Sequence, residues 1–480
     1  MEKREVDVAI IGAGTAGMVA YQRVRKATDR VVLIEGEQYG TTCARVGCMP
    51  SKLLIAAAEH AHAMVKAEEF GISPGKVSID GRRVMERVHQ ERDRFVSSVV
   101  ESVNGFPERH RLIGHARFAG PNRLVVGDDV EVHAERIIIA TGSRPNIPGF
   151  LKEAEDRLVV NDDLFDWDDL PVSVAVFGPG VIGLELGQAL SRLGVRVRMF
   201  GVGGAIGSIR DDAIRACALE VFNQEFPLDP DADVTHVERT DEGVAVTFRN
   251  GSGKPVTETF DYLLAATGRR PNVDNLDIQN ADIELDDRGS PVFDKYTLRC
   301  GDSHIFIAGD ANNDRPLLHE AAEEGRIAGD NAAAWPDVRT GLRYVPLGVV
   351  FTDPQIASVG LTIDQVGEQC HGCFAVGEVS FADQGRSRVI GKNRGILRVY
   401  GEHGSGLFMG AEMFGPAAEH IAHLLAWCAQ KRMTVSEMAA MPYYHPVIEE
   451  GLRTALKQLN RNLRIGPEMT DECLECGPGV

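Results

Sequence analysis

Two glycine-rich fingerprints, each set between an apolar strand and a helical stretch, constrain the fold of this chain more than any other feature. The first follows VDVAII and places Gly12, Gly14 and Gly17 in G-x-G-x-x-G spacing, ahead of a second strand, VVLIE. In this motif the first glycine makes a tight turn, the second admits a pyrophosphate, and the third lets the helix approach the strand. Glu35 closes the second strand, where an acid can bond to ribose hydroxyls.

The same order of strand, glycine motif, helix and strand occurs again in the middle of the chain. VSVAVF (172–177) is followed by GPGVIG, which supplies Gly178, Gly180 and Gly183, then by a helical stretch and the strand VRVRMF. Two dinucleotide folds in one chain indicate two bound dinucleotides, and the alternative is a structural duplicate with one empty site. We therefore predict an α/β protein with two Rossmann-like dinucleotide-binding domains.

Two further segments with a shared motif indicate where the 480-residue chain crosses between domains. IIIATGSRPNIPG (137–149) and LLAATGRRPNVDN (263–275) are both apolar strands followed by ATGxRPN, and from about 344 mixed strands and an amphipathic helix predict an α+β unit. We therefore expect four parts, 1–148, 149–271, 272–343 and 344–480, which the family resemblance described below implies are an FAD-binding, an NAD(P)-binding, a central and a dimerisation domain.

Charge and cysteine content narrow the class of protein. The net charge is −19, from 51 Lys and Arg against 70 Asp and Glu, which argues against a nucleic-acid binder. The glycine-broken N-terminal stretch does not read as a signal peptide and no apolar run is long enough to cross a bilayer, so we expect a cytoplasmic protein without membrane association. Because an odd nine cysteines in such a chain disfavour a structural disulfide framework, a disulfide here should be catalytic or redox-sensing.

Cys43 and Cys48, in TTCARVGCMPSK, are the best candidates for that disulfide. Five steps along a straight helix would separate their Cα atoms by about 8 Å, whereas a disulfide needs about 4.4–6.8 Å. A bridge therefore requires a break, which Gly47 can provide. Cys48 would then begin a helix, where the dipole and nearby Lys52 lower a thiol pKa. Buried structural cysteines and half of a metal site remain the alternatives.

The order of these motifs resembles a known family. An FAD fingerprint, C-x4-C, ATGxRP, a second fingerprint, ATGRRPN, FIAGD and a late His-Pro are similar to the pyridine nucleotide-disulfide oxidoreductases over nearly the whole chain. Within that family the chain looks most like the dihydrolipoamide (dihydrolipoyl) dehydrogenases. The resemblance implies FAD and NAD(H) as cofactors, with NADP(H) left open, and no resident metal.

Residue roles follow from the resemblance by matching position. Cys48 would be the thiolate next to the flavin, Cys43 the interchange thiol that meets substrate, and Lys52 a cation near flavin N5 paired with Glu185. The helix from about Leu318 would aim its N-terminus at the flavin pyrimidine. The implied cofactor-binding positions are Gly12, Gly14, Gly17, Glu35, Thr42, Lys52, Ala116, Thr141, Gly142, Asp310 and Leu318, together with Gly178, Gly180, Gly183 and Gly268.

The late motif PYYHPVIEEG carries the implied base, His445, with Glu450 as its carboxylate partner and Glu449 as the neighbouring alternative. Histidine suits thiol deprotonation near neutral pH, and a carboxylate holds its tautomer. In the family this pair acts on the partner subunit's disulfide, so a homodimer is implied. Electrons would run from dihydrolipoamide, on a lipoyl domain of a 2-oxoacid dehydrogenase or a glycine-cleavage carrier protein, to NAD⁺.

Several positions depart from the family pattern. Arg45 stands where the family has an amide beside the interchange thiol. Val447 stands where a threonine is usual after His-Pro, and Leu318 stands where the family commonly has a small residue. These departures leave open an NADPH-dependent reductase of another small disulfide, of the glutathione-reductase kind, or a metal-ion reductase. A flavin-bearing scaffold is the non-enzyme alternative. We expect Cys217, Cys300 and Cys428 in the core, and the Cys370/Cys373 and Cys473/Cys476 pairs to be incidental rather than a metal site or an electron relay.

The nicotinamide preference depends on the strand VRVRMF, which ends in Gly201 instead of the acid that NAD-using relatives place there. The paired arginines of NADPH-using relatives are absent too, since Val202 and Ser208 stand in their places. An unpaired phosphate is costly to desolvate, whereas a missing acid loses only a hydrogen bond or two. We therefore predict a modest preference for NADH, unless Arg198 or Arg210 reaches the phosphate.

Overall fold

The computed structural model describes residues 1–464, so the Cys473/Cys476 pair lies outside the described residues. The first fingerprint forms the parallel centre of a seven-stranded sheet in the order β3-β2-β1-β6-β5-β4, with β17 paired to β6. Its strands are β1 (Glu2–Ile11), β2 (Val31–Glu35), β3 (Arg111–Ile113), β4 (Ala116–Gly120), β5 (Arg123–Val126), β6 (Val130–Ile139) and β17 (Ile305–Ile307).

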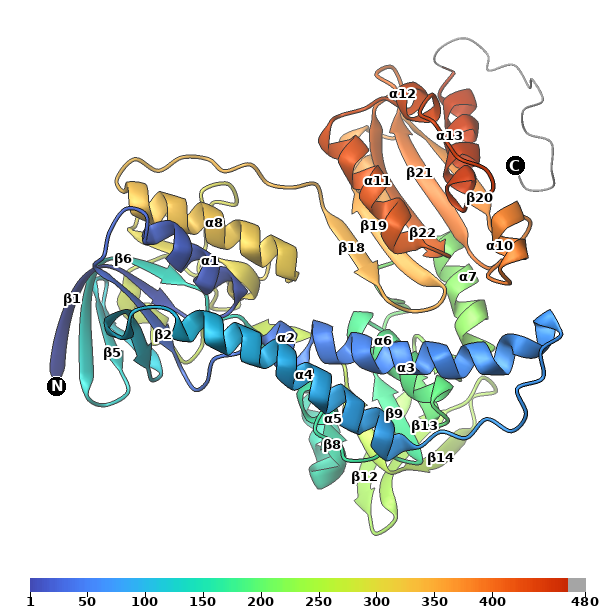
Figure 1. Ribbon diagram of the computed structural model, residues 1–480, viewed down its shortest axis with the longest axis horizontal. Coiled ribbons are helices and arrows are strands. Elements are labelled where there is room, and N and C mark those ends of the chain that lie inside the picture. Colours follow the sequence, from blue (N-terminus) through green and yellow to red (C-terminus); the bar gives the residue numbers. More distant parts are fainter. Residues whose placement is uncertain (465–480) are drawn as a thin grey trace.

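Two helices from distant parts of the chain lie side by side against this sheet, α1 (Thr15–Val24) and α8 (Leu318–Ala334) (Figure 1). Small residues permit the close approach. A Cβ added at Gly325 would meet the backbone of Ala16, and one at Gly329 would meet that of Ala20. The first turn of α8 is thereby held beside the first fingerprint.

The second fingerprint forms a five-stranded parallel sheet in the order β11-β10-β9-β15-β8. It comprises β8 (Leu158–Val159), β9 (Ser173–Phe177), β10 (Arg196–Phe200), β11 (Leu228–Asp229) and β15 (Tyr262–Ala265), with helices α6 (Val181–Arg192) and α7 (Asp212–Asn223) and the antiparallel strands β12 (Val234–Thr240), β13 (Gly243–Arg249) and β14 (Pro255–Phe260) beside it. The predicted α/β class with two Rossmann-like units is confirmed.

The two ATGxRPN segments form paired strands. Strand β7 (Ser143–Pro145) runs antiparallel to β16 (Arg269–Pro271), and the Thr267 hydroxyl donates to the Asn146 carbonyl at 2.6 Å. The two segments that leave and re-enter the first sheet therefore form one two-stranded ribbon, which joins the two nucleotide folds.

The C-terminal part is a five-stranded antiparallel sheet in the order β18-β19-β22-β21-β20. Its strands are β18 (Leu347–Val350), β19 (Gln355–Gly360), β20 (Phe374–Ser380), β21 (Ile396–Glu402) and β22 (Phe408–Gly415), with helices α9 (Ile363–Gln369), α10 (Gly385–Val389), α11 (Ala418–Gln430), α12 (Val435–Ala439) and α13 (Glu449–Leu463). Leu425 of α11 and Leu456 of α13 belong to the same buried core, and an extended segment joins α8 to β18 (Figure 1).

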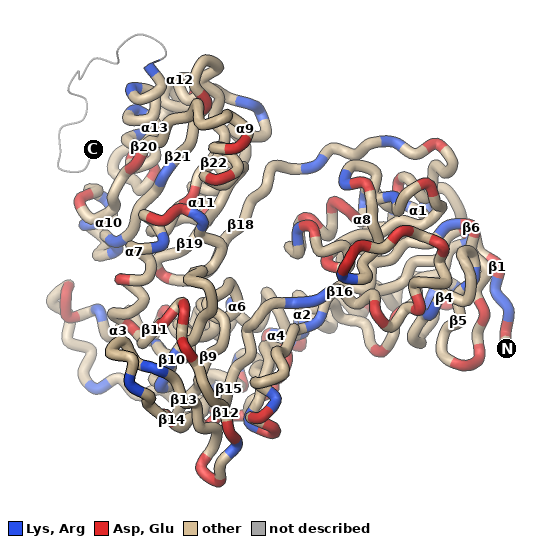
Figure 2. Tube along the Cα trace, turned by 180° about the vertical axis from the view of Figure 1, so that it is seen from behind, with Lys and Arg blue, Asp and Glu red and all other residues tan. Residues whose placement is uncertain are grey.

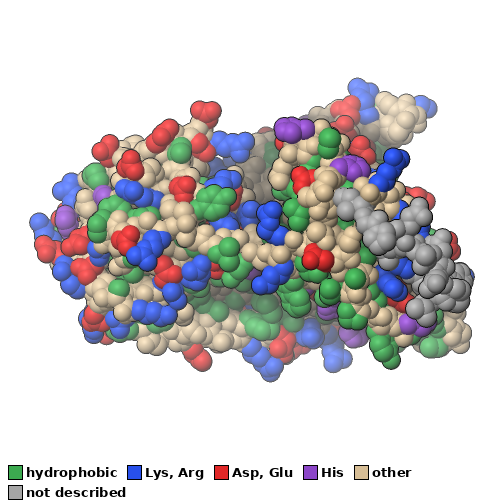
Figure 3. Space-filling model, turned by 90° about the horizontal axis from the view of Figure 1, so that it is seen from above, with side chains coloured by type: hydrophobic (Ala, Val, Ile, Leu, Met, Phe, Trp, Pro, Cys, Tyr) green, Lys and Arg blue, Asp and Glu red, His purple; other side chains and the backbone are tan. Residues whose placement is uncertain are grey.

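A long helical pair lies between these bodies. The redox segment forms α2 (Thr42–Val46) and α3 (Cys48–Lys66), α4 (Gly81–Asn104) packs along α3, and the short α5 (Asn161–Leu164) lies near α2 (Figure 1). Among residues 1–464 no helix is both long and apolar enough to span a membrane. Basic and acidic residues alternate along the trace of each body and intermingle on the face seen from above (Figures 2 and 3).

Candidate active site

The redox segment is broken where the cysteine spacing requires it. Helix α2 ends at Val46 and α3 begins at Cys48, with Gly47 between them at φ −128° and ψ −115°. A Cβ at Gly47 would stand 3.0 Å from the Thr42 carbonyl oxygen, so the absence of a side chain permits the turn. The break brings the Cys43 and Cys48 thiols, both unlinked here, into hydrogen-bond contact.

The two thiols differ in acidity. The hydrogen bond from the Cys43 thiol, aided by the charge of Lys52, lowers the pKa of Cys48 to about 7 against the opposing effect of burial. The same hydrogen bond, together with burial, raises the pKa of Cys43. Cys48 is therefore the thiolate of the pair near neutral pH, and Cys43 keeps its proton.

Lys52 and Glu185 meet across two helices of different units. Lys52 Nζ in α3 lies 2.6 Å from Glu185 Oε2 in α6 and 4.6 Å from the centre of the Phe351 ring. The other Glu185 oxygen accepts the Phe351 N–H at 2.9 Å, and Glu185 is only 4% exposed. The carboxylate thus holds the ammonium group in place beside Cys48.

A cavity of about 270 Å³ opens beside these groups. It is lined by residues from both nucleotide folds and from the first turn of α8; among the predicted site residues these are Gly14, Thr42, Cys43, Cys48, Lys52, Gly142, Glu185, Asp310 and Leu318. The Ser143 hydroxyl donates to Asp310 at 2.8 Å, which orients that carboxylate at the cavity wall. The N-terminus of α8 carries no side-chain cap, so its N–H groups are free to face a ligand.

The first fingerprint fits a dinucleotide residue by residue. A Cβ at Gly12 would meet the Ala140 carbonyl and one at Gly17 the Gly12 carbonyl, whereas one at Gly14 would meet nothing within 4 Å. The second glycine therefore leaves the backbone accessible, and α1 begins there without a side-chain cap, as a pyrophosphate site requires. The Gly178, Gly180 and Gly183 set repeats this pattern at the start of α6.

Other predicted cofactor positions lie outside the cavity lining. Glu35 accepts the N–H groups of Ala13 and Gly36 at 2.8 and 2.9 Å. Ala116 is buried in β4, and Gly268 immediately precedes β16. In the described chain the Thr141 hydroxyl is buried without a hydrogen-bond partner, which fits a group that accepts or donates there.

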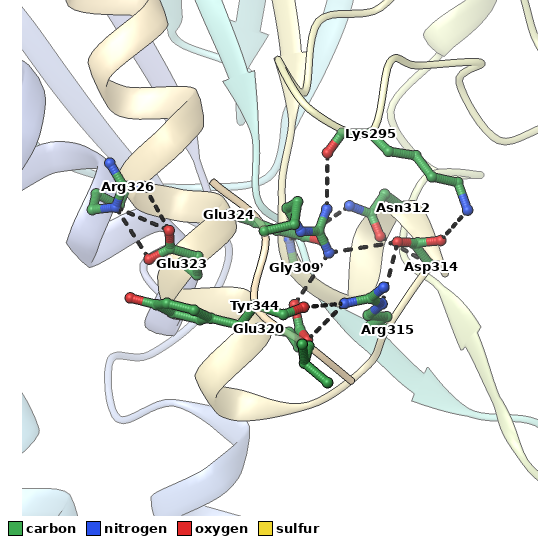
Figure 4. A network of polar contacts seen from close by, with 12 residues as sticks. Lys295, Gly309, Asn312, Asp314, Arg315, Glu320, Glu323, Glu324, Arg326 and Tyr344 are labelled. Carbon is green, nitrogen blue, oxygen red and sulfur yellow. Dashed lines mark hydrogen bonds and ion pairs between the residues drawn. The ribbon is translucent and has the colours of Figure 1, made fainter. Parts of the chain in front are cut away.

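A buried polar network behind the cavity was not predicted. Arg343 lies 3.1 Å from Glu320 and 2.8 Å from Glu324, both fully buried. Figure 4 shows these two carboxylates on α8 with their polar contacts. Glu324 also accepts the Gly309 N–H and the Asn312 amide at 2.7 Å each, and burial raises its pKa. The network fixes the turn that presents Asp310; its only sequence signal is a pair of acids four residues apart on one helical face.

The predicted hydrogen bond between His445 and Glu450 forms in the C-terminal part. His445 Nδ1 donates to Glu450 Oε1 at 2.8 Å, and the Val447 N–H donates to Oε2 at 3.1 Å, so Glu450 is the partner rather than Glu449. The His445 side chain is 69% exposed while that of Glu450 is 11% exposed. His445 does not line the cysteine cavity. Helix α13, which begins four residues later at Glu449 and carries Glu450, lies well away from α2 in both chain views (Figures 1 and 2).

The remaining candidates are Arg198 of β10 and the described cysteines other than Cys43 and Cys48. Arg198 pairs with Glu258 at 2.9 Å and lies over the Phe248 ring, so it faces β14 and β13. Burial raises the pKa of Cys300 to about 12. Cys217 and Cys428 are half-buried, and Cys370 is buried while Cys373 is exposed. Within residues 1–464 no group of three His, Cys, Asp or Glu side chains could hold a metal ion.

Arg45, which departs from the family pattern, lies in α2, close enough to α5 for its charge to affect Asp162. The amide of Asn161 in α5 donates to the Val46 carbonyl at 2.8 Å. Burial raises the pKa of the neighbouring Asp162, and the charges of Arg269 and Arg45 oppose that shift. Arg45 therefore contributes positive charge to the junction of the redox segment with the second nucleotide fold.

Two dinucleotide folds, a thiol pair and a lysine paired with a buried carboxylate at one cavity define a flavin- and nicotinamide-dependent redox protein. Residues 6–325 match the pyridine nucleotide-disulphide oxidoreductase family, and residues 347–456 match the dimerisation domain of that family. The chain belongs to this family, whose cofactors are FAD and NAD(P)H.

Similar proteins include enzymes of differing substrate. A dihydrolipoyl dehydrogenase of Haloferax volcanii is 31% identical over 465 residues, which cover 94% of this chain and 95% of the relative. A mycothione reductase of Mycobacterium tuberculosis is also 31% identical, over 94% of this chain and 98% of its own. The HOCl-induced flavoprotein disulfide reductase RclA of Escherichia coli shares the fold, with a TM-score of 0.79 at 23% identity over 94% of this chain and 99% of its own.

Proposed function

We propose that this flavoprotein disulfide oxidoreductase oxidises dihydrolipoamide on a lipoyl domain with NAD⁺, through a Cys43–Cys48 disulfide. The observation that carries the proposal is the thiol pair itself, with a Cys48 pKa of about 7 beside the Lys52–Glu185 pair. Dihydrolipoyl dehydrogenases of similar length, 29–31% identical to this chain, support lipoamide as the substrate. The lipoyl domain would belong to a 2-oxoacid dehydrogenase or a glycine-cleavage carrier protein.

In the oxidised enzyme, one dihydrolipoamide thiol loses its proton to His445, its thiolate attacks Cys43 Sγ, and the Cys43–Cys48 bond breaks. Cys48 leaves as the thiolate, which the charge of Lys52 stabilises. The second substrate thiol then attacks the mixed disulfide, its proton passes to the departing Cys43 sulfur, and lipoamide is released; the Cys43 thiol can then donate its hydrogen bond to Cys48. Two electrons move to the cysteine pair, and the substrate protons pass to His445 and to Cys43. Bound FAD supplies the two-electron chemistry that links this pair to the nicotinamide.

His445 would act in a homodimer, which the matched dimerisation domain supports. Because His445 is exposed and distant from the cavity of its own chain, Cys43 of one subunit would meet His445 of the partner subunit. Glu450 holds the imidazole with Nδ1–H toward the carboxylate, which leaves Nε2 to accept the substrate proton. The division at residues 148, 271 and 343 into FAD, NAD, central and dimerisation domains is part of the same proposal.

A second candidate is the reduction of another low-molecular-weight disulfide with a nicotinamide donor. The mycothione reductase relative, as similar to this chain as the dihydrolipoyl dehydrogenase, favours it, and so does the positive charge of Arg45 next to Cys43. This direction uses the same cysteine pair, which would be reduced first and would then attack the incoming disulfide.

A substrate panel with both nicotinamides separates these functions. We expect rapid turnover of dihydrolipoamide with NAD⁺ and of lipoamide with NADH, and slow turnover of glutathione disulfide, mycothione disulfide and Hg²⁺ with either NADH or NADPH. Cys43→Ser is the matched control, because it removes the interchange thiol and should abolish turnover with every disulfide. Faster turnover of mycothione or glutathione disulfide than of lipoamide would contradict the lipoamide proposal and favour the second candidate.

A further inference from the structure

The two nucleotide folds have the same backbone register at the strand end where an acid binds adenine ribose. The Gly12 N–H donates to the carbonyl of Ile34, just before Glu35, and the Gly178 N–H donates to that of Phe200, just before Gly201. The distances are 2.7 and 2.8 Å. Gly201 is therefore the structural counterpart of Glu35, which is the ribose-binding position of this fold.

The second fold has no room for an acid at that position. In the first fold Glu35 accepts the Ala13 N–H. The counterpart of Ala13 is Pro179, which has no N–H to offer. A Cβ at Gly201 would stand 2.8 Å from Pro179 Cγ and 2.5 Å from the Pro230 carbonyl oxygen. The second fold therefore lacks both the carboxylate and the backbone N–H that would position it.

The turn after β11 occupies the space next to this strand end. Strand β11 lies beside β10 as β3 lies beside β2. Backbone bonds join the turn to the loop after β10: Gly201 N–H donates to Asp229, Gly204 N–H to Pro230, and Ala232 N–H to Gly201. These contacts hold the turn against the loop that borders the ribose position.

Asp231 is the side chain that this turn directs at the loop. One Asp231 oxygen accepts the Gly203 N–H at 2.7 Å. In the described chain its second oxygen has no hydrogen-bond partner, and Asp231 is exposed. We propose that Asp231 supplies, from the neighbouring strand, the acid that binds the adenine ribose of NAD(H) and disfavours the 2′-phosphate of NADP(H).

Arg198 does not oppose this assignment, because its side chain is paired with Glu258. Arg210 is held at its backbone N–H by Glu412 in β22, and its exposed side chain is the cation that would have to reach a 2′-phosphate if the assignment were wrong. Val202, which follows the strand, is 84% exposed and carries no charge. Asp231 is therefore the charged side chain that contacts the loop after β10. The inference rests on the NAD(H) use in the proposed function and adds the residue that decides it.

Equilibrium binding of redox-inert fragments tests the inference apart from catalysis. We would titrate the FAD-loaded protein with ADP-ribose and with 2′-phospho-ADP-ribose by calorimetry. Asp231→Asn keeps the side-chain size and the acceptor for Gly203 while removing the charge. We expect it to raise the Kd of ADP-ribose about tenfold, the scale of one charged hydrogen bond, and to lower that of the 2′-phosphate analogue.

Asp233→Asn is the matched control, since Asp233 carries the same charge nearby but pairs with Arg249 at 3.2 Å. It should leave both Kd values unchanged. An unchanged Kd ratio in Asp231→Asn, an equal change in Asp233→Asn, or tighter binding of the 2′-phosphate analogue by the unaltered protein would each overturn the inference. Because no disulfide substrate takes part, these outcomes are independent of whether lipoamide is the substrate.

Discussion

The cavity around Cys48 and the segment around His445 each hold an ionisable pair. In the first region the pair lines the same cavity as two thiols of its own chain, whereas in the second it lies outside that cavity. Lys52 and Glu185 join two helices of one chain, and Glu185 is buried beside the ammonium group that it holds near Cys48. His445 and Glu450 form a 2.8 Å hydrogen bond with the imidazole exposed, outside the cavity that Cys43 and Cys48 line. On the proposed mechanism, one subunit would therefore suffice for the nucleotide half-reaction, whereas the thiol half-reaction would require two.

The largest expected effect separates the two cysteines. Cys43→Ser should abolish disulfide turnover and leave the Cys48 thiolate, which should show a long-wavelength charge-transfer band with FAD without prior reduction. In the unaltered pair the hydrogen bond from Cys43 and the charge of Lys52 lower the pKa of Cys48 to about 7; the variant keeps Lys52 but replaces the thiol donor, so the band should grow as pH rises, with a midpoint at or above that value, and vanish at low pH. Absorbance titration measures the midpoint. Cys48→Ser should show no band, and a band there instead would reverse the assignment.

The next effect concerns the base. His445→Gln should lower kcat/KM for dihydrolipoamide by at least about 10²-fold, the usual range for a lost general base. Stopped-flow reduction of the flavin by NADH should be unchanged, because that half-reaction uses the other region. His420→Gln is the control, since this exposed histidine pairs only with neighbouring Glu419. Equal loss of both half-reactions would remove the distinction between the two regions.

A smaller effect is expected at the buried carboxylate. Glu185→Gln keeps an acceptor for the Phe351 N–H but leaves Lys52 without its counter-charge. We expect a loss of about 1–2 kcal/mol in the free energy of unfolding, at the lower end for a charged pair because Lys52 is partly exposed. Urea unfolding measures it.

Glu69→Gln, in the exposed Lys66–Glu69 pair, is the control for this substitution and should have no measurable effect. If Glu185→Gln is equally silent in urea unfolding, the ion pair between α3 and α6 does not stabilise the fold.

The smallest effect is expected from removing the C-terminal residues. Truncation after Met469 deletes Cys473 and Cys476, which lie outside the described residues. Since these cysteines stand among acidic residues and are not required by the proposed mechanism, lipoamide turnover should stay largely intact. Steady-state assays check this, and lost turnover with retained flavin would instead support an electron relay through the tail.

Much of the site could be predicted because its signals are local in the sequence. Glycine spacing, the strand–helix–strand order and the Gly47 break each depend on backbone geometry within a few residues. Assignments that depended on contacts between distant strands were harder to make. Alternation along β10 could not place Arg198, which the structure pairs with Glu258 of β14.

By itself, the sequence determined the family and the two nucleotide folds, and it predicted the cysteine pair, the base and the Lys52–Glu185 pair, because each depends on residue type at fixed spacing or on position within the family motifs. Only the tertiary structure decided other contacts. It placed Arg343 between the buried acids of α8 and set Asp231 against the loop after β10. These contacts join residues far apart along the chain, and burial, charge and steric exclusion at such contacts exist only once the sheets have packed.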